Sequence, residues 1–520
     1  MSDFPILTVT AALPLVGAIA AAVTPRRDRE TAKRIGLATS LVTLAFAIRA
    51  AVMFHENGPR YQLIENHQWI RQFGVSYALG VDGIGMVMVL LTAALMPIVL
   101  LGAWSELDSG ENAQPERGGG STGTFVAMLL VLESMAILQF AALDVFLFYV
   151  LFEAMLIPMY FLIGRYGGPQ RQYAAVKFLL YNLLGGLLML VGVIWIYFAG
   201  PGGDQAYLLP NLVGFHFGVH TARWMFLALF VAFAIKAPLW PFHTWLPDAA
   251  AEATPSNAVL LSGILDKVGV FGMLHLCLPL FPEASRWFAP TIVVLSVISI
   301  IYGALLAIGQ ADMKRLIAYM SVSHFGFIVL GIFVMTSQGH SGATLYMVNH
   351  AFATAGIFFA ASFMMSRRGS RLISAYGGVQ KVAPVLAGSL MFAGLANLSL
   401  PGMSTFISEF LVLVGTFTQY KVAGLVAVAG VLLAALYVLI YYQRTMTGEL
   451  TPETENTPDL TLREILVVAP VMAVIIALGF FPKPLLDYIN PSVEATLSTL
   501  QKTDPTPVHP AAAAAAGVSR

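Results

Sequence analysis

Residues 234–255, AIKAPLWPFHTWLPDAAAEATP, place a lysine and a proline inside an apolar segment that is long enough to cross a membrane. Lys236 carries a charge that is costly in hydrocarbon, and Pro238 removes a backbone hydrogen bond and interrupts the helix. An interrupted helix is tolerated at membrane depth only where its free backbone groups are buried in protein or line a polar cavity. The stretch therefore predicts a broken membrane helix whose lysine has a function.

The composition of the whole chain is that of a polytopic membrane protein. Of its 520 residues, 58% are hydrophobic and 11% are charged, which is less than half the charged fraction of an ordinary soluble domain. A spanning helix needs about twenty apolar residues. We therefore predict an all-α fold of about 14 transmembrane helices near residues 4–23, 34–54, 79–104, 123–142, 144–164, 173–199, 223–245, 253–280, 288–309, 312–336, 342–366, 384–417, 422–445 and 462–481.

The positions of lysine and arginine predict how the chain is oriented. Loops after odd-numbered predicted helices hold seventeen of these residues, whereas loops after even-numbered helices hold five. Since basic loops stay on the inner side of a membrane, both termini are expected on the outer side. Acidic Asp3 stands where a signal peptide has basic residues, so the first helix is expected to be retained. The Pro- and Ala-rich stretch after about residue 482 is predicted to be partly disordered.

A second interruption suggests an internal repeat. Five helices after the first break, GLANLSLPGMSTFISEF contains Pro401 and Gly402, followed by Glu409. Broken helices at matching positions are typical of transporters built from inverted repeats. We predict two inverted five-helix repeats, helices 4–8 and 9–13, with broken helices 7 and 12. The resulting domains are residues 1–122, 123–280 and 281–446, followed by helix 14 and a tail over 447–520.

Few ionisable residues lie inside the predicted spans, and each is a functional candidate by default because an unpaired charge there is costly. We predict a pair between Glu153 and Lys236, continued by carriers in the second repeat. The main candidates are Glu153, Lys236, Lys267, His324, His350 and Glu409, and the supporting candidates are Glu133, His243 and Asp266. The alternatives are a static ion pair, neutral core histidines and, for Glu133, a hydrogen bond between packed helices.

These residue types suit proton transfer. Burial favours the neutral form of a lysine and a nearby carboxylate favours its charged form, so moving the carboxylate switches the lysine between holding and releasing a proton. Histidine titrates near neutral pH without adjustment. Free carbonyl groups beside Pro238 and Pro401 are suited to bind waters that connect such carriers.

Several strings resemble a known family. They are YALGVDGIGM, FYVLFEAMLIPMYFLIGRYGG, FAIKAPLWPFHTWLPDAAAEATP, ADMKRLIAYMSVSHFGFIVLG, NHAFATAGIFF and LPGMSTFISEFLVL. Over nearly its whole length the chain resembles the antiporter-like membrane subunits of respiratory complex I, NADH–quinone oxidoreductase. These are also similar to subunits of multisubunit sodium/proton antiporters and membrane-bound hydrogenases. Glu409, where two of the three subunit types generally have lysine, resembles the M type, as does the lack of a long C-terminal lateral helix.

The resemblance implies a function. It implies a proton-translocating membrane-arm subunit of NADH–quinone oxidoreductase, with the six main candidates as the proton carriers and with coupling to quinone reduction elsewhere in the complex. No cofactor is implied in this chain, because NADH, FMN, iron–sulfur clusters and quinone belong to partner subunits. The implied partners are other membrane-arm subunits, including homologous antiporter-like subunits L and N on either side, and lipids of the bacterial inner membrane. In one departure, Asp266 replaces a residue that is apolar in many members and is expected to hold Lys267 protonated.

Some alternatives remain open and others are excluded. The nearest alternative is a subunit of a sodium/proton antiporter or a membrane-bound hydrogenase, and a second is a scaffold whose buried charges are static. A self-sufficient solute transporter would need a substrate-selective polar cluster, which is not evident. A formal net charge of zero argues against nucleic acid as a partner. The single cysteine, Cys277, leaves no thiolate metal site or iron–sulfur cluster in the chain.

Overall fold

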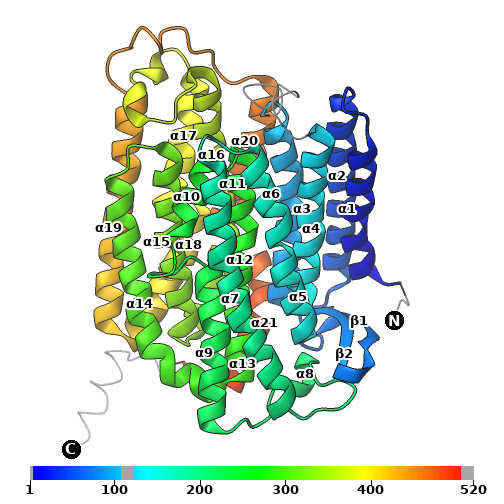
Figure 1. Cartoon of the computed structure of the whole chain (residues 1–520). Helices are drawn as coiled ribbons and strands as arrows, with labels where there is room; N and C mark the ends of the chain where they lie inside the picture. Colours follow the sequence, from blue (N-terminus) through cyan, green and yellow to red (C-terminus); the bar gives the residue numbers. More distant parts are fainter. Residues whose placement is uncertain (1–3, 107–120, 505–520) are drawn as a thin grey trace, which may run out of the picture.

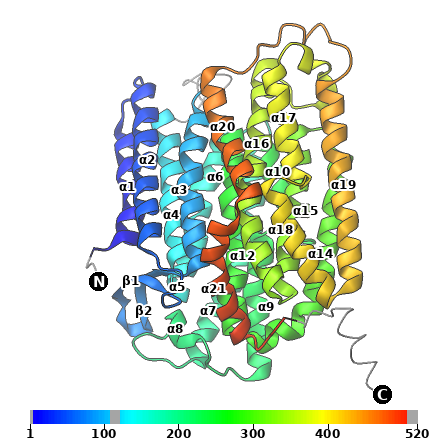
Figure 2. The same cartoon turned by 180° about the vertical axis from the view of Figure 1, so that it is seen from behind.

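The computed structural model describes residues 4–106 and 121–504, which form an upright bundle of helices with one small β-hairpin at its end (Figure 1). Viewed from behind in Figure 2, the N-terminal helices lie at one side and α19 at the other, with the remaining helices between them. The first elements in the chain are α1 (Ile6–Val23), α2 (Arg29–Met53), β1 (Gln62–Ile70), β2 (Val75–Val81) and α3 (Gly83–Ala103).

The middle of the chain contains the broken helix that was predicted from Lys236 and Pro238. One helix ends at Lys236 and the next begins at Trp245, so the segment is discontinuous as expected. The elements in order are α4 (Thr122–Ala141), α5 (Val145–Ala154), α6 (Leu156–Tyr166), α7 (Arg171–Ala199), α8 (Leu209–Leu212), α9 (Val219–Lys236), α10 (Trp245–Glu252), α11 (Pro255–Leu260), α12 (Asp266–Gly272) and α13 (Leu278–Leu280).

The last part of the chain contains the second predicted break. Helix α17 ends at Asn397 and α18 begins at Ser404, with Pro401 and Gly402 between them. The elements in order are α14 (Pro282–Ile308), α15 (Met313–Phe333), α16 (Ser337–Arg368), α17 (Pro384–Asn397), α18 (Ser404–Gln419), α19 (Lys421–Met446), α20 (Leu462–Phe480) and α21 (Lys483–Thr499).

The predicted set of membrane spans is confirmed with one refinement. Among the described residues, thirteen helical segments are long and apolar enough to cross a membrane, and each coincides with a predicted span. The remaining predicted span, helix 12 at 384–417, is divided between α17 and α18, and each of these is too short to cross a membrane alone. The span predicted at 144–164 is also interrupted, because α5 ends at Ala154 and α6 begins at Leu156. The inverted relation between the two halves stays a prediction.

Helix α21 and the β-hairpin were not predicted. Residues 483–499 form α21, which packs against α3 and α16, so the first part of the stretch that was predicted to be partly disordered is an ordered helix. Buried Ile489 and Val493 give α21 an apolar side, which the Pro- and Ala-rich sequence further along the chain had obscured. The remainder of that prediction, residues 505–520, lies outside the described residues.

The β-hairpin precedes the third span, whose predicted start at residue 79 falls inside β2. Strands β1 and β2 pair antiparallel, with Glu65 opposite Leu79. Gly74, in the connection, has φ +63°, and a Cβ there would lie 2.2 Å from the backbone oxygen of Gly203. Both the backbone angle and the close approach therefore require glycine. Asp82 then caps α3 by accepting a hydrogen bond from the Gly85 backbone N–H at 2.8 Å.

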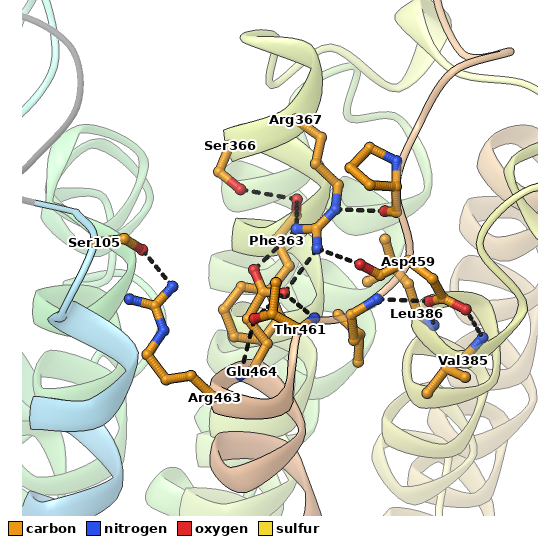
Figure 3. Close-up of polar contacts among 12 residues, drawn as sticks. Ser105, Phe363, Ser366, Arg367, Val385, Leu386, Asp459, Thr461, Arg463 and Glu464 are labelled. Atoms are coloured by element: carbon orange, nitrogen blue, oxygen red, sulfur yellow. Dashed lines mark hydrogen bonds and ion pairs between the residues drawn. The ribbon is translucent and has the colours of Figure 1, made fainter.

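A polar network fixes the start of the broken helix α17 (Figure 3). The Asp459 carboxylate accepts hydrogen bonds from the backbone N–H groups of Val385 and Leu386, at 2.9 and 2.8 Å. Arg367 at the end of α16 donates to the backbone oxygen of Asp459 and forms a two-pronged pair with Glu464 of α20, at 3.0 and 2.7 Å. This pair is almost fully buried, so removing either partner would leave an uncompensated charge. The network holds α16, α17 and α20 together at one end of the bundle.

Candidate functional site

Lys236 is the last residue of α9, directly before the break, and is buried. Its side chain is 1% exposed, and its Nζ has no hydrogen-bond partner among the described residues. The ammonium group lies 4.6 Å from the centre of the Phe152 ring on α5. A buried lysine without a hydrogen-bond partner is expensive, and within the described residues no ion pair holds Lys236 as a static clamp.

Glu153, the predicted partner of Lys236, lies in the last turn of α5 directly before the interruption at Met155. The structure contains no ion pair between the two side chains, so the expected direct contact is absent, although they interact electrostatically. Glu153 is only half-buried, and its carboxylate packs closely against the backbone of Gly186 on α7. A carboxylate at the rim of a membrane bundle needs a polar neighbour, because lipid cannot solvate it.

Gly186 sets the position of this carboxylate and allows a direct test. A Cβ at Gly186 would lie 1.5 Å from Glu153 Oε1, so Gly186→Ala must displace the carboxyl group. Since that group is the end of a flexible side chain, we expect normal folding and assembly but a several-fold loss of proton transport, measured in vesicles containing the assembled protein. Gly164→Ala, on α6, is the matched control because a Cβ there meets only Ala175 at 3.2 Å. Full transport by Gly186→Ala would show that the position of Glu153 is unimportant.

Asp266 and Lys267 begin α12, which lies between two π-helical segments, Leu261–Leu265 and Met273–Cys277. Such wide turns shift backbone carbonyl groups out of register and often occur at functional sites. Lys267 uses one of these groups, because its Nζ donates to the backbone oxygen of Ser262. The Asp266 carboxylate has no hydrogen-bond partner among the described residues and interacts electrostatically with both Lys236 and Lys267. The Asp266 carboxylate is therefore close enough to both lysines to stabilise a positive charge on either one.

A series of contacts leads from Lys267 into the second half of the protein. Lys267 Nζ lies 2.7 Å from Nδ1 of His350 on α16. The His350 ring is 5.2 Å from the ring of His324 on α15, centre to centre. His324 Nε2 in turn lies 3.4 Å from the hydroxyl group of Tyr437 on α19. Three of the predicted carriers are thus neighbours in one buried series.

Glu409, on α18, lies at the far end of this series. Its carboxylate accepts hydrogen bonds from Tyr346 at 3.4 Å and from Ser399, which lies in the break between α17 and α18. Tyr346 also packs against His324, with ring centres 5.8 Å apart. Hydroxyl groups can accept and donate a proton in turn, so Tyr346 and Tyr437 are suited to connect His324 with Glu409.

The supporting candidates are not all joined to the series. Glu133 is completely buried on α4, and neither of its oxygens has a hydrogen-bond partner among the described residues, so the alternative interpretation, a hydrogen bond between packed helices, finds no support there. His243 lies in the break between α9 and α10 and contacts Tyr302 and Tyr319 through its ring. Neither of its nitrogens has a partner within the described part of the chain.

Sequence reasoning missed several polar groups. Tyr346 and Tyr437 carry no charge and resemble ordinary core aromatics in sequence, so their contacts with His324 and Glu409 gave no signal. His275, on the second π-helical segment, is buried and was not singled out although it lies inside a predicted span. Glu106 follows the third span and looks like a loop residue, but burial raises the pKa of its carboxyl group to about 7 although hydrogen bonds from Ser256 oppose the shift.

Comparison with known proteins identifies the family to which this chain belongs. A family model described as NADH:quinone oxidoreductase/Mrp antiporter, transmembrane, matches residues 142–435, which include both breaks and all six main candidates. The chain belongs to this family. The resemblance seen in the sequence motifs is therefore confirmed.

Individual relatives in the NADH:quinone oxidoreductase/Mrp antiporter family are similar over almost the whole chain. NADH-quinone oxidoreductase subunit M of Mycobacterium tuberculosis is 49% identical, covering 99% of this chain and 98% of that protein. A chain of respiratory complex I from Thermus thermophilus matches with a TM-score of 0.85 and 29% identity, covering 95% of this chain and 99% of that chain. A chain of the Mrp complex from Dietzia sp. DQ12-45-1b has the same fold, with a TM-score of 0.82 and 21% identity over 96% and 100% of the two chains.

Proposed function

We propose that this chain is the M-type, proton-translocating membrane-arm subunit of an NADH–quinone oxidoreductase. Family membership and the near full-length similarity to subunit M of Mycobacterium tuberculosis support the assignment to this enzyme complex. The single observation that supports proton transport is the contact between Lys267 and His350, because it connects the lysines of the first half with the series ending at Glu409.

The proposed cycle begins at Glu153. Glu153 is half-buried and lies beside Lys236 without forming an ion pair with it, so a charged group of a neighbouring subunit can reposition its carboxylate. When Glu153 moves away, Lys236 loses its electrostatic support and releases a proton, because desolvation then dominates. Asp266 lies in the field of both lysines and stabilises the charge while it passes from Lys236 toward Lys267.

The second half of the cycle moves the proton from Lys267 to Glu409. Neutral His350 accepts at Nδ1 from the Lys267 ammonium group, 2.7 Å away. His324, Tyr437 and Tyr346 continue the series toward the Glu409 carboxylate. The free backbone groups between α17 and α18 favour water around Glu409, from which the proton leaves. Each transfer returns its donor to the starting state once Lys236 is reprotonated.

The remaining assignments follow from the same proposal. Homologous antiporter-like subunits L and N lie on either side, and one of them contacts the half-buried Glu153. NADH, FMN, iron–sulfur clusters and quinone are bound by partner subunits. The protein spans the bacterial inner membrane with both termini outside, as the excess of Lys and Arg in alternate loops supports.

Purification from the native host tests the assignment. The tagged chain, extracted in mild detergent, is expected to bring down an assembly that oxidises NADH with a quinone acceptor and contains flavin and iron–sulfur clusters. Isolation with only small membrane subunits and without reductase activity would contradict the proposal and favour an antiporter. The tag is best placed at the C-terminal tail, since the N-terminal helices pack within the bundle.

A further inference from the structure

A cavity opens at the end of the bundle where α6, α10 and α16 terminate, outside the buried series described above. Its volume is about 740 Å³, and its rim includes exposed Pro169, Ser366 and Gly369. Its walls hold Glu106, Glu252, Lys314 and Arg371. This end of the bundle also carries the basic loops after odd-numbered helices, so the cavity faces the side from which a pump of this orientation takes up protons.

Glu106 differs from the other charged residues of this cavity. Glu252 pairs with Arg371 at 2.8 Å, and Arg371 also pairs with Asp312 at 2.7 Å. Lys314 Nζ donates a hydrogen bond to the backbone oxygen of Ala253 at 2.7 Å. Glu106 Oε1 accepts from the backbone N–H and the hydroxyl group of Ser256, at 3.1 and 2.9 Å, whereas its buried Oε2 has no partner among the described residues.

Polar groups occur along the helical segment that runs inward from Ser256, the hydrogen-bond partner of Glu106. Ser256 lies in the first turn of α11, and Lys267 follows eleven residues later in the same helical segment, about 16 Å deeper at 1.5 Å per residue. Between them, Asn257 Oδ1 and Ser262 Oγ are buried and have no hydrogen-bond partner within the described residues. Buried polar atoms of this kind are usually satisfied by ordered water. These polar groups end at the Ser262 backbone oxygen, which accepts from Lys267 Nζ.

We propose that this cavity is the entrance through which protons reach Lys267 from the aqueous phase, and that Glu106 is the carboxylate that collects them. The inference rests on the proposed function, because it assumes that Lys267 is a proton carrier. Glu106 takes a proton from water in the cavity and passes it through waters beside Asn257 and Ser262 to neutral Lys267, which becomes an ammonium group. Lys267 then passes this proton to Lys236, which supplies the reprotonation that the proposed cycle requires. Glu106 is then again a carboxylate.

The charges around Glu106 suit this role. Lys314 of α15 favours the carboxylate. Arg371, which follows α16, Glu252 of α10 and Tyr166 of α6 line the same cavity. Arg463 of α20 is bound to neighbouring Ser105 at 2.9 Å. Burial is the largest influence and raises the pKa of Glu106 to about 7, so near neutral pH the group is poised to exchange protons with water.

Glu106→Gln in the intact, purified assembly tests the proposal. Glutamine keeps an oxygen for the hydrogen bonds from Ser256 but cannot carry a proton. We expect proton pumping into proteoliposomes to fall roughly tenfold at alkaline pH. The deficit should shrink at mildly acidic pH, because direct protonation of the route by the solvent then becomes faster. Glu106→Asp should retain most of the pumping.

The controls separate this inference from the proposed function. Glu283→Gln removes a carboxylate that pairs with Arg223 at the opposite end of the bundle and is expected to leave pumping unchanged. If the unmodified assembly pumps and Glu106→Gln matches it at alkaline pH, the entrance proposal is wrong while the function stands. A loss of pumping that is independent of pH and shared by Glu106→Gln and Glu106→Asp would also overturn the entrance proposal, because such a loss would assign Glu106 a structural role. Absence of reductase-coupled pumping in the unmodified assembly would instead overturn the proposed function.

Discussion

Lys236→Ala is expected to reduce proton pumping by the assembled complex roughly a hundredfold or more, because a positioned proton carrier contributes about that factor or more to a transfer step. Lys236 Nζ has no hydrogen-bond partner among the described residues and is 1% exposed. Its removal therefore breaks no ion pair, and the complex is expected to assemble. Pumping is measured as NADH-driven acidification of proteoliposomes, together with quinone reduction in the same preparation.

The matched control for this substitution is Lys483→Ala. Lys483 is 83% exposed at the start of α21, and its one ion pair within the described part of the chain is with Asp487, one turn later. An exposed pair of this kind contributes little to stability, so pumping should be unchanged. Normal pumping by Lys236→Ala would contradict the proposal that Lys236 is a carrier, and failure of both variants to assemble would point to a general requirement for these lysines in folding.

Glu409→Gln is expected to reduce proton pumping by a factor similar to that expected for Lys236→Ala. Glutamine can still accept hydrogen bonds from Ser399 and Tyr346, so the break between α17 and α18 should keep its structure. It cannot bind and release a proton, however, so the series that begins at Lys267 has no terminal acceptor. The measurement is proton pumping per NADH oxidised, compared with Glu494→Gln on α21, where the carboxylate is exposed. Pumping that persists in Glu409→Gln would place the exit elsewhere.

The broken helices and the candidate carriers were accessible to sequence reasoning for a physical reason. A charge or a proline in an apolar segment is so unfavourable in lipid that its presence alone marks an unusual environment. Lys236, Pro238, Pro401 and Glu409 all stood out in this way, and the structure places both breaks beside them.

Contacts between helices were not accessible, because one sequence does not show which faces meet. The absence of an ion pair between Glu153 and Lys236 depends on how α5 and α9 are oriented. The participation of Tyr437 depends on packing between α15 and α19. Neutral residues give no signal in an apolar segment. Helix α21 was missed because the Pro- and Ala-rich sequence that follows it decided the prediction for the whole C-terminal stretch.

The central claim is that Lys236 releases and rebinds a proton during turnover, and Lys236→Arg tests it most directly. Arginine keeps the positive charge and much of the volume but does not give up its proton. The measurement is the number of protons pumped per NADH oxidised by the assembled complex in proteoliposomes. We predict that Lys236→Arg assembles and pumps as poorly as Lys236→Ala. Pumping at the unmodified level would mean that only the charge matters, and would contradict the account by making Lys236 a static electrostatic anchor.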